Sequence, residues 1–268
     1  MPHQRAGDLE VFYRQWQGEG DEPLVLVHGN WSTHRWWIPT AEALLKLEAG
    51  RARFGEILAI DMRGRGDTRG PDNDYTIPAL AEDLRAFIAA RELGPRLHLV
   101  GHSLGSAVAM QFALEHRERL ASLCVVSPAW VDGMPEAWNR PELQRVTQDD
   151  IERFASVLAP MAPTAPRDAF WRELVETGHR QRWAATLHNL DALVNWKPGD
   201  ALKQLTMARM VVEGEQDPLC GGETARRAAE ALGARRVRMA GVGHSPNLEV
   251  PARFAALLVE LAEIAAEG

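Results

Sequence analysis

The chain has 268 residues, of which 46% are hydrophobic, and it carries a formal net charge of −7. This length fits one α/β domain with an insertion, and the apolar content suffices for a large core. Acidic and basic residues are interspersed, which excludes a basic face for nucleic acid or for an anionic membrane, so neither partner is expected.

The first residues and the two cysteines bear on the cellular compartment. Residues 1–11 lack the apolar core of a secretion signal, and the most apolar stretch, residues 255–264, is interrupted by two glutamates. Cys124 and Cys220 are too few for a disulfide framework or a metal cluster. We therefore expect a cytoplasmic protein with no stable membrane association. The sequence leaves open whether it is a monomer or a homodimer.

The first part of the chain alternates strand-like and helix-like segments. A strand is predicted at residues 9–16, at the edge of a sheet. Two continuous apolar runs are typical of strands buried on both faces of a parallel sheet, and two segments have apolar residues at helical spacing. The runs are residues 23–27 and 56–60, and the predicted helices are residues 39–48 and 77–93. The glycine-containing turn at residues 61–67 opens no helix, so we interpret it as structural rather than nucleotide-binding.

The sequence LHLVGHSLG at residues 97–105 joins a buried strand to a helix predicted over residues 107–120. A reversal this sharp brings the two backbones close together, so glycine is required on either side of the bend, here at Gly101 and Gly105. Ser103 then stands at the strained tip, where the helix directs free N–H groups and a positive dipole end toward whatever the hydroxyl attacks. We interpret Ser103 as a nucleophile; the alternative is a serine that only caps the helix.

The loop after residues 23–27 reads HGNW. Gly29 lets the main chain approach a reacting carbonyl closely, and we expect the N–H of Asn30 to donate to an oxyanion there. The alternative is that His28 and Asn30 only form hydrogen bonds within their own turn. Gly29 and Trp31 are expected to contact the substrate.

The alternation breaks between residues 128 and 199, where no strand-like run occurs and prolines and tryptophans are frequent. We expect a helical cap that lies over the carboxyl edge of the sheet, excludes water and shapes a ligand cavity. Trp130 and Trp138 are expected to contact the substrate from this side. Helices are predicted at residues 151–158, 167–177 and 180–194. The expected cap is residues 131–199, and the expected core domain is residues 1–130 with 200–268.

Strands and helices alternate again on both sides of this insertion. Such alternation is typical of right-handed βαβ units around a parallel sheet. The predicted strands are residues 122–126, 209–213 and 236–239, and the predicted helices are residues 223–232 and 247–266.

A serine nucleophile needs a base to take its proton and a carboxylate to orient that base. The loops after the last two predicted strands offer Asp217 in GEQDP and His244 in GVGHSP, at the sheet edge where Ser103 emerges. The alternatives are that Asp217 only forms a turn, with Glu213 or Glu215 as the acid, and that His244 is a buried loop histidine. No histidine pair has zinc-binding spacing, so neither a metal nor another cofactor is expected.

With HGN, DMRGRGD, GHSLG, GEQDP and GVGHSP in this order, the chain resembles the α/β-hydrolase family over nearly its whole length. The resemblance implies the α/β class, with an eight-stranded, mostly parallel sheet flanked by helices and a helical cap inserted after the sixth strand. It also implies a catalytic triad of Ser103, Asp217 and His244. An oxyanion hole would be formed by the N–H groups of Asn30 and Leu104.

These residues predict an enzyme, a serine hydrolase that cleaves small to medium apolar carboxylic esters through an acyl-enzyme intermediate. Lactones, peroxyacids, carbon–carbon bonds of diketones and N-terminal prolyl peptides are alternative substrates for the same catalytic groups. Hydroxynitrile lyase activity is a further alternative. A receptor that binds a ligand without turnover is the alternative outside enzymes. An aminopeptidase would need carboxylates in the cap to hold the substrate amine, and the candidates are Glu136, Glu142, Asp149 and Glu173.

Overall fold

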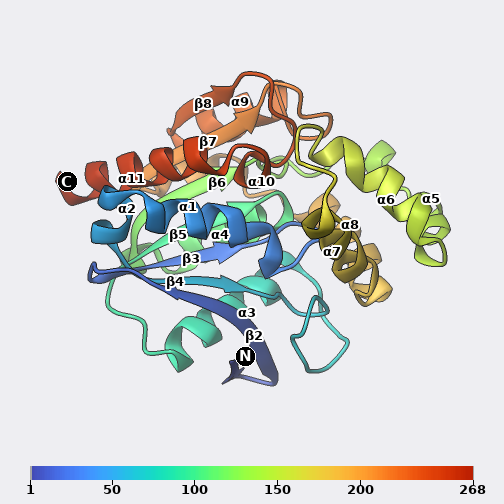
Figure 1. The fold of residues 1–268 in the computed structure, drawn as a ribbon, viewed down its shortest axis with the longest axis horizontal. Helices are drawn as coiled ribbons and strands as arrows, with labels where there is room; N and C mark the ends of the chain where they lie inside the picture. The colour runs from blue at the N-terminus through green and yellow to red at the C-terminus, as the bar shows by residue number, and fades with distance from the viewer. Residues whose placement is uncertain (1, 268) are drawn as a thin grey trace.

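Eight strands form one twisted sheet in the computed structural model, which describes residues 2–267 (Figure 1). Their order in the sheet is β1-β2-β4-β3-β5-β6-β7-β8. β2 pairs with its two neighbours in the antiparallel sense, and all other neighbouring strands are parallel. The predicted α/β class and the mostly parallel, eight-stranded sheet are therefore confirmed. The strands are β1 (His3–Ala6), β2 (Leu9–Gln17), β3 (Glu22–Val27), β4 (Phe54–Ile60), β5 (Leu97–His102), β6 (Leu120–Val126), β7 (Ala208–Gly214) and β8 (Arg235–Met239).

The edge of the sheet lies one strand farther out than the sequence predicts. Residues 9–16 are expected at the edge, but β2 has a neighbour on each side, and β1 is the edge strand. Gly7 adopts a φ of +60°, which permits the tight turn between β1 and β2. The strand-forming signal of β1 is weak because its sequence, HQRA, is almost entirely polar.

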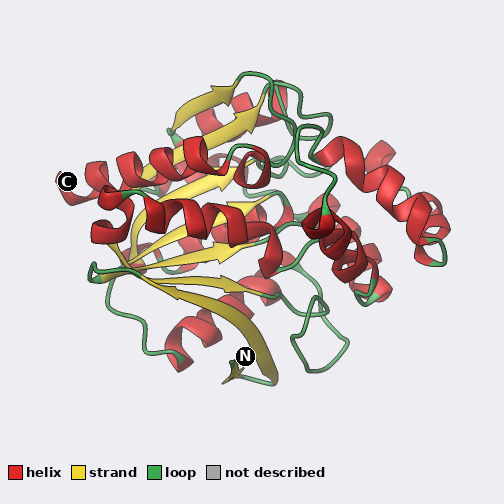
Figure 2. Cartoon of the chain, in the orientation of Figure 1, coloured by secondary structure: helices red, strands yellow, loops and turns green. Residues whose placement is uncertain are grey.

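Helices cover both faces of the sheet (Figure 2). The side chains of β3 alternate between two apolar clusters: Val25 and Val27 pack with residues of α3, α4 and α9, and Leu24 and Leu26 pack with residues of α1 and α11. All four side chains are at most 1% exposed, as expected for a central parallel strand. The helices are α1 (Ile38–Lys46), α2 (Glu48–Arg53), α3 (Ile77–Ala90), α4 (Leu104–Glu115), α9 (Glu223–Leu232), α10 (Pro246–Glu249) and α11 (Pro251–Glu267).

Several predicted helices begin or end one to three residues away from the observed ones, and two differ more. α4 begins directly after Ser103 and ends at Glu115, whereas the apolar spacing predicts residues 107–120. The predicted end is too late, because Leu120 already belongs to β6. The C-terminal segment forms α10 and α11 instead of one helix. Val250 separates them with φ −136° and ψ 55°, since a residue that precedes proline is disfavoured in helical conformation.

Only helices and loops are described between β6 and β7. They lie at one end of the sheet, toward the right in Figure 1. α5 is not predicted, because its sequence, PELQRVTQ, has few apolar positions. The helices of this segment are α5 (Pro141–Gln148), α6 (Ile151–Leu158), α7 (Ala169–His179) and α8 (Trp183–Asn195). Within residues 2–267, no helix combines the length and the hydropathy that crossing a membrane requires.

Candidate active site

Ser103 occupies a strained position between β5 and α4. Its φ of 52° and ψ of −118° lie in a region that non-glycine residues rarely adopt. A Cβ at Gly101 would overlap the carbonyl of Gly105, and a Cβ at Gly105 would overlap the carbonyls of Val27 and His28. The turn therefore requires both glycines, as its sequence predicts, and Ser103 stands at the carboxyl end of the central strand.

Asp217 and His244 meet at the ends of β7 and β8. Nδ1 of His244 lies 2.9 Å and 3.0 Å from the two carboxylate oxygens of Asp217. The same carboxylate accepts hydrogen bonds from the N–H groups of Leu219 and Cys220. Burial acts to raise the pKa of Asp217, but the imidazole and the two N–H groups outweigh it and lower that pKa, so the carboxylate stays ionised. An ionised Asp217 keeps the proton of neutral His244 on Nδ1 and leaves Nε2 able to accept one.

The two rival carboxylates have other partners. Glu213 is fully buried and pairs with Arg236, and it also accepts from the N–H of Gly222. Glu215 accepts from the N–H of Gly241 at the surface. Of these three acids, only Asp217 forms hydrogen bonds with Nδ1 of His244 in the described part of the chain.

Ser103 and His244 line the same cavity, whose volume is about 580 Å³. Three tryptophans expected to contact a substrate, Trp31, Trp130 and Trp138, line it as well. Gly29 is not among the described residues that line it, and its contact with a substrate stays a prediction. A Cβ at Gly29 would lie 3.0 Å from Nδ1 of His102 and 3.1 Å from Cβ of Ser103, so Gly29 allows the two loops to pack together.

The two expected oxyanion donors lie in the loop after β3 and directly after Ser103. Asn30 lines the cavity. Leu104 is the first residue of α4, so its N–H has no acceptor within the helix.

The charged side chains that line the cavity, apart from histidines, are Arg140 and Arg153. An aminopeptidase would need a carboxylate at this place to hold a substrate amine. No carboxylate is found among the lining residues that the structure describes, and Glu173 instead pairs with Arg35. The four candidates, Glu136, Glu142, Asp149 and Glu173, are not among these lining residues.

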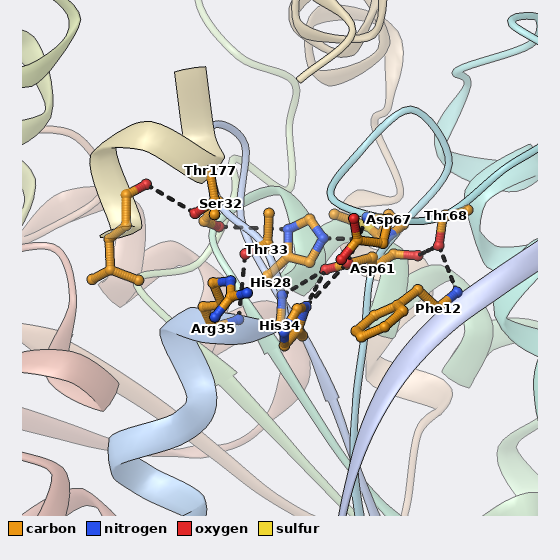
Figure 3. Close-up of polar contacts among 12 residues, drawn as sticks. Phe12, His28, Ser32, Thr33, His34, Arg35, Asp61, Asp67, Thr68 and Thr177 are labelled. Carbon is orange, nitrogen blue, oxygen red and sulfur yellow. Dashed lines mark hydrogen bonds and ion pairs between the residues drawn. The ribbon is translucent and has the colours of Figure 1, made fainter. Parts of the chain in front are cut away.

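A second buried Asp–His pair supports the loop that carries Asn30 (Figure 3). Asp61 is 0% exposed and accepts hydrogen bonds from the backbone N–H of His34 at 2.7 Å and from its Nδ1 at 2.9 Å. His28 also bridges the two loops, because its Nε2 accepts from the N–H of Met62 at 3.1 Å. Burial lowers the pKa of His28 to about 4, so its ring is neutral. His28 therefore does more than form hydrogen bonds within its own turn. The pairing of Asp61 with His34 could not be predicted from the spacing of these residues in the sequence.

His102 is a further residue that the sequence does not single out. It is buried beside the nucleophile, and its Nε2 lies 2.8 Å from the carbonyl oxygen of His244. Burial lowers the pKa of His102 to about 3. A neutral His102 can therefore donate from Nε2 and hold the backbone of the His244 loop.

Comparisons with known proteins agree with this architecture. The model of the Alpha/beta hydrolase family matches residues 24–257. N-formylmaleamate deformylase from Pseudomonas putida is 35% identical over 124 residues, which are 46% of this chain and 43% of that enzyme. The chain spans about two fifths of the length of this and of another curated relative.

Two further comparisons extend over most of the chain. Lipase 1 from Psychrobacter immobilis is 23% identical over 256 residues, 91% of this chain and 77% of the lipase. The solved structure of the esterase EaEST from Exiguobacterium antarcticum has a TM-score of 0.85 at 19% identity, covering 98% of this chain and 99% of that one. By the family match and the shared fold, the chain belongs to the alpha/beta hydrolase family.

Proposed function

We propose that this hydrolase cleaves carboxylic esters of small to medium size and apolar character through an acyl-enzyme intermediate on Ser103. The observation that carries the proposal is the pairing of Asp217 with His244 at a cavity that Ser103 also lines. An oriented imidazole that lines the same cavity as a serine at a strained turn can activate the serine hydroxyl for acyl transfer.

The proposed reaction begins when Nε2 of His244 takes the proton of the Ser103 hydroxyl. Oγ attacks the ester carbonyl carbon, and the N–H groups of Asn30 and Leu104 donate to the oxyanion that forms. The carbon–oxygen bond to the alcohol then breaks, and the alcohol leaves with the proton held by His244. In the second step a water molecule gives a proton to His244 and attacks the acyl carbon. The bond to Oγ breaks, Ser103 takes the proton back from His244, and the carboxylic acid leaves. The ionised Asp217 stabilises the imidazolium in both steps.

Residues 131–199 are proposed to act as a cap over a core domain formed by residues 1–130 and 200–268. The cavity is lined from both parts, by Asn30 and Ser103 on one side and by Val157 and Leu190 on the other. Walls of this kind would exclude water and select apolar groups. Trp31, Trp130 and Trp138 are proposed to contact the substrate.

The test is a series of nitrophenyl esters of increasing acyl length, assayed beside lactones and prolyl amides, with Ser103→Ala as the control. Turnover of short and medium esters is expected, and the control should lose it by several orders of magnitude. A fluorophosphonate should label Ser103, as mass spectrometry can check. Tight binding of a ligand without turnover of any ester, or an adduct on another serine, would overturn the proposal.

A further inference from the structure

Arg65 is a buried cation that has no carboxylate partner among the described residues. It lies in the turn after β4 and is 1% exposed. Its guanidinium donates to Oδ1 of Asn30, to Oγ1 of Thr186 at 3.1 Å and to the carbonyl of Arg182 at 3.4 Å. All three acceptors are neutral. Burying a charge without an opposite charge is costly, so its presence here calls for a compensating benefit.

Arg63 shows that the same turn can neutralise an arginine. It lies two residues earlier and is 7% exposed. Its guanidinium donates to both oxygens of Asp83, at 2.7 Å and 2.8 Å, and pairs with Asp8 at 3.2 Å. One turn therefore holds a compensated arginine and an uncompensated one, and they differ in what they face.

The uncompensated arginine faces the loop of the candidate oxyanion donor. Asn30 receives its hydrogen bond through the side chain and lines the cavity that Ser103 also lines. The other two acceptors, Thr186 and Arg182, lie in and directly before α8. Arg65 thus joins the β4 turn, the Asn30 loop and the helical segment at one point.

We propose that Arg65 is a positioning residue that holds Asn30 with its N–H toward the reacting carbonyl and places an unneutralised positive charge behind the developing oxyanion. The inference rests on the proposed function to the extent that Ser103 is the nucleophile. A bound ester carbonyl is neutral, whereas the tetrahedral adduct is anionic, so the charge acts on the transition state and not on substrate binding.

The test compares Arg65→Gln and Arg65→Lys with the matched control Arg63→Lys. The first readout is the rate constant for labelling of Ser103 by a fluorophosphonate, in which the Oγ–P bond forms, the P–F bond breaks and fluoride leaves. The second is kcat and KM on a short nitrophenyl ester, with thermal melting as a check of folding. Arg65→Gln should slow labelling and lower kcat by about 10- to 100-fold at nearly unchanged KM.

The variants separate the two parts of the role. Arg65→Lys keeps the charge without the fork of three hydrogen bonds and should show a smaller loss. Asn30→Ala removes the acceptor but keeps the backbone N–H, and it should also slow labelling. Arg63→Lys should melt at a lower temperature and label at a rate within about twofold of wild type.

Two results would overturn the inference: a folded Arg65→Gln that labels at the wild-type rate, or an equal loss of labelling in Arg63→Lys. Labelling does not require turnover. A wild-type protein that is labelled at Ser103 but hydrolyses no ester would therefore contradict the ester proposal, while the comparison of the variants would still decide the role of Arg65.

Discussion

The ionised side chain of Asp217 determines which nitrogen of His244 can accept a proton. Its amide analogue can present an N–H to Nδ1 and thereby move the imidazole proton to Nε2, where it blocks proton transfer from a serine. Asp217→Asn should therefore lower kcat by a factor on the order of 10⁴ in a folded protein. Ester kinetics measure this, with Glu215→Gln as the control that stays within about twofold. A variant that retained a tenth of the wild-type rate would remove Asp217 from the mechanism.

Gly29 controls how closely its loop packs against the nucleophile. A methyl group there would lie 3.0 Å from His102 and 3.1 Å from Cβ of Ser103, closer than ordinary van der Waals contact. Gly29→Ala should shift the Ser103 turn and lower kcat by about 10- to 100-fold, since small displacements of reacting groups are costly.

Gly94→Ala is the matched control for this substitution. A Cβ at Gly94 has no neighbour within 4 Å, so the same chemical change should leave kcat unaltered. Equal kinetics of the two variants would show that the close approach at Gly29 has no bearing on the reaction.

Single residues of the site differ in how far the sequence predicts them. Ser103, Asp217 and His244 could be selected because each follows a strand, and parallel strands end at one edge of the sheet. Arg65 and the pair of Asp61 and His34 could not, because their contacts join loops that no periodicity relates. The cavity walls depend in the same way on how separate helices pack.

Among the elements, the loops after β3 and β4 act as a unit because Asp61 joins them. This carboxylate is bonded to both the backbone and the ring of His34 and to the N–H of Asp67. Asp61→Asn should lower the free energy of unfolding by about 3 kcal/mol, since it removes the negative charge and one acceptor oxygen from a buried pair. Urea denaturation measures this. Asp67→Asn, which keeps the backbone N–H, is the control and should change the free energy by less than about 0.5 kcal/mol.

Element boundaries were predictable where apolar spacing alone determines them. α6 and α9 have the predicted bounds, Ile151–Leu158 and Glu223–Leu232. The errors lie where another effect dominates: polar β1 is held by its pairing with β2, and the break between α10 and α11 follows from Pro251. Strand pairing and proline stereochemistry act beyond the hydrophobic pattern.

For the molecule as a whole, three buried histidines link stability to pH. Burial lowers the pKa of His28 and of His98 to about 4 and that of His102 to about 3, from 6.5 in each case. The unfolded chain binds a proton at each position near pH 6.5, whereas the folded chain does not until the lower values are reached. The associated stability is therefore complete above pH 6.5 and is lost as the pH falls toward 4.

This linkage predicts a loss of about 4 kcal/mol in the free energy of unfolding between pH 7 and pH 5.5, roughly 1.3 kcal/mol for each histidine. Urea denaturation at several pH values measures it. His98→Gln changes a residue at the start of the sheet's central β5, at the opposite end of that strand from Ser103, and should reduce the loss by about a third. His3→Gln, at an exposed position, should leave the loss unchanged. If the free energy of unfolding stayed constant over this range, burial would not hold the three rings neutral. The role of a neutral His102 in supporting the His244 loop would then be wrong as well.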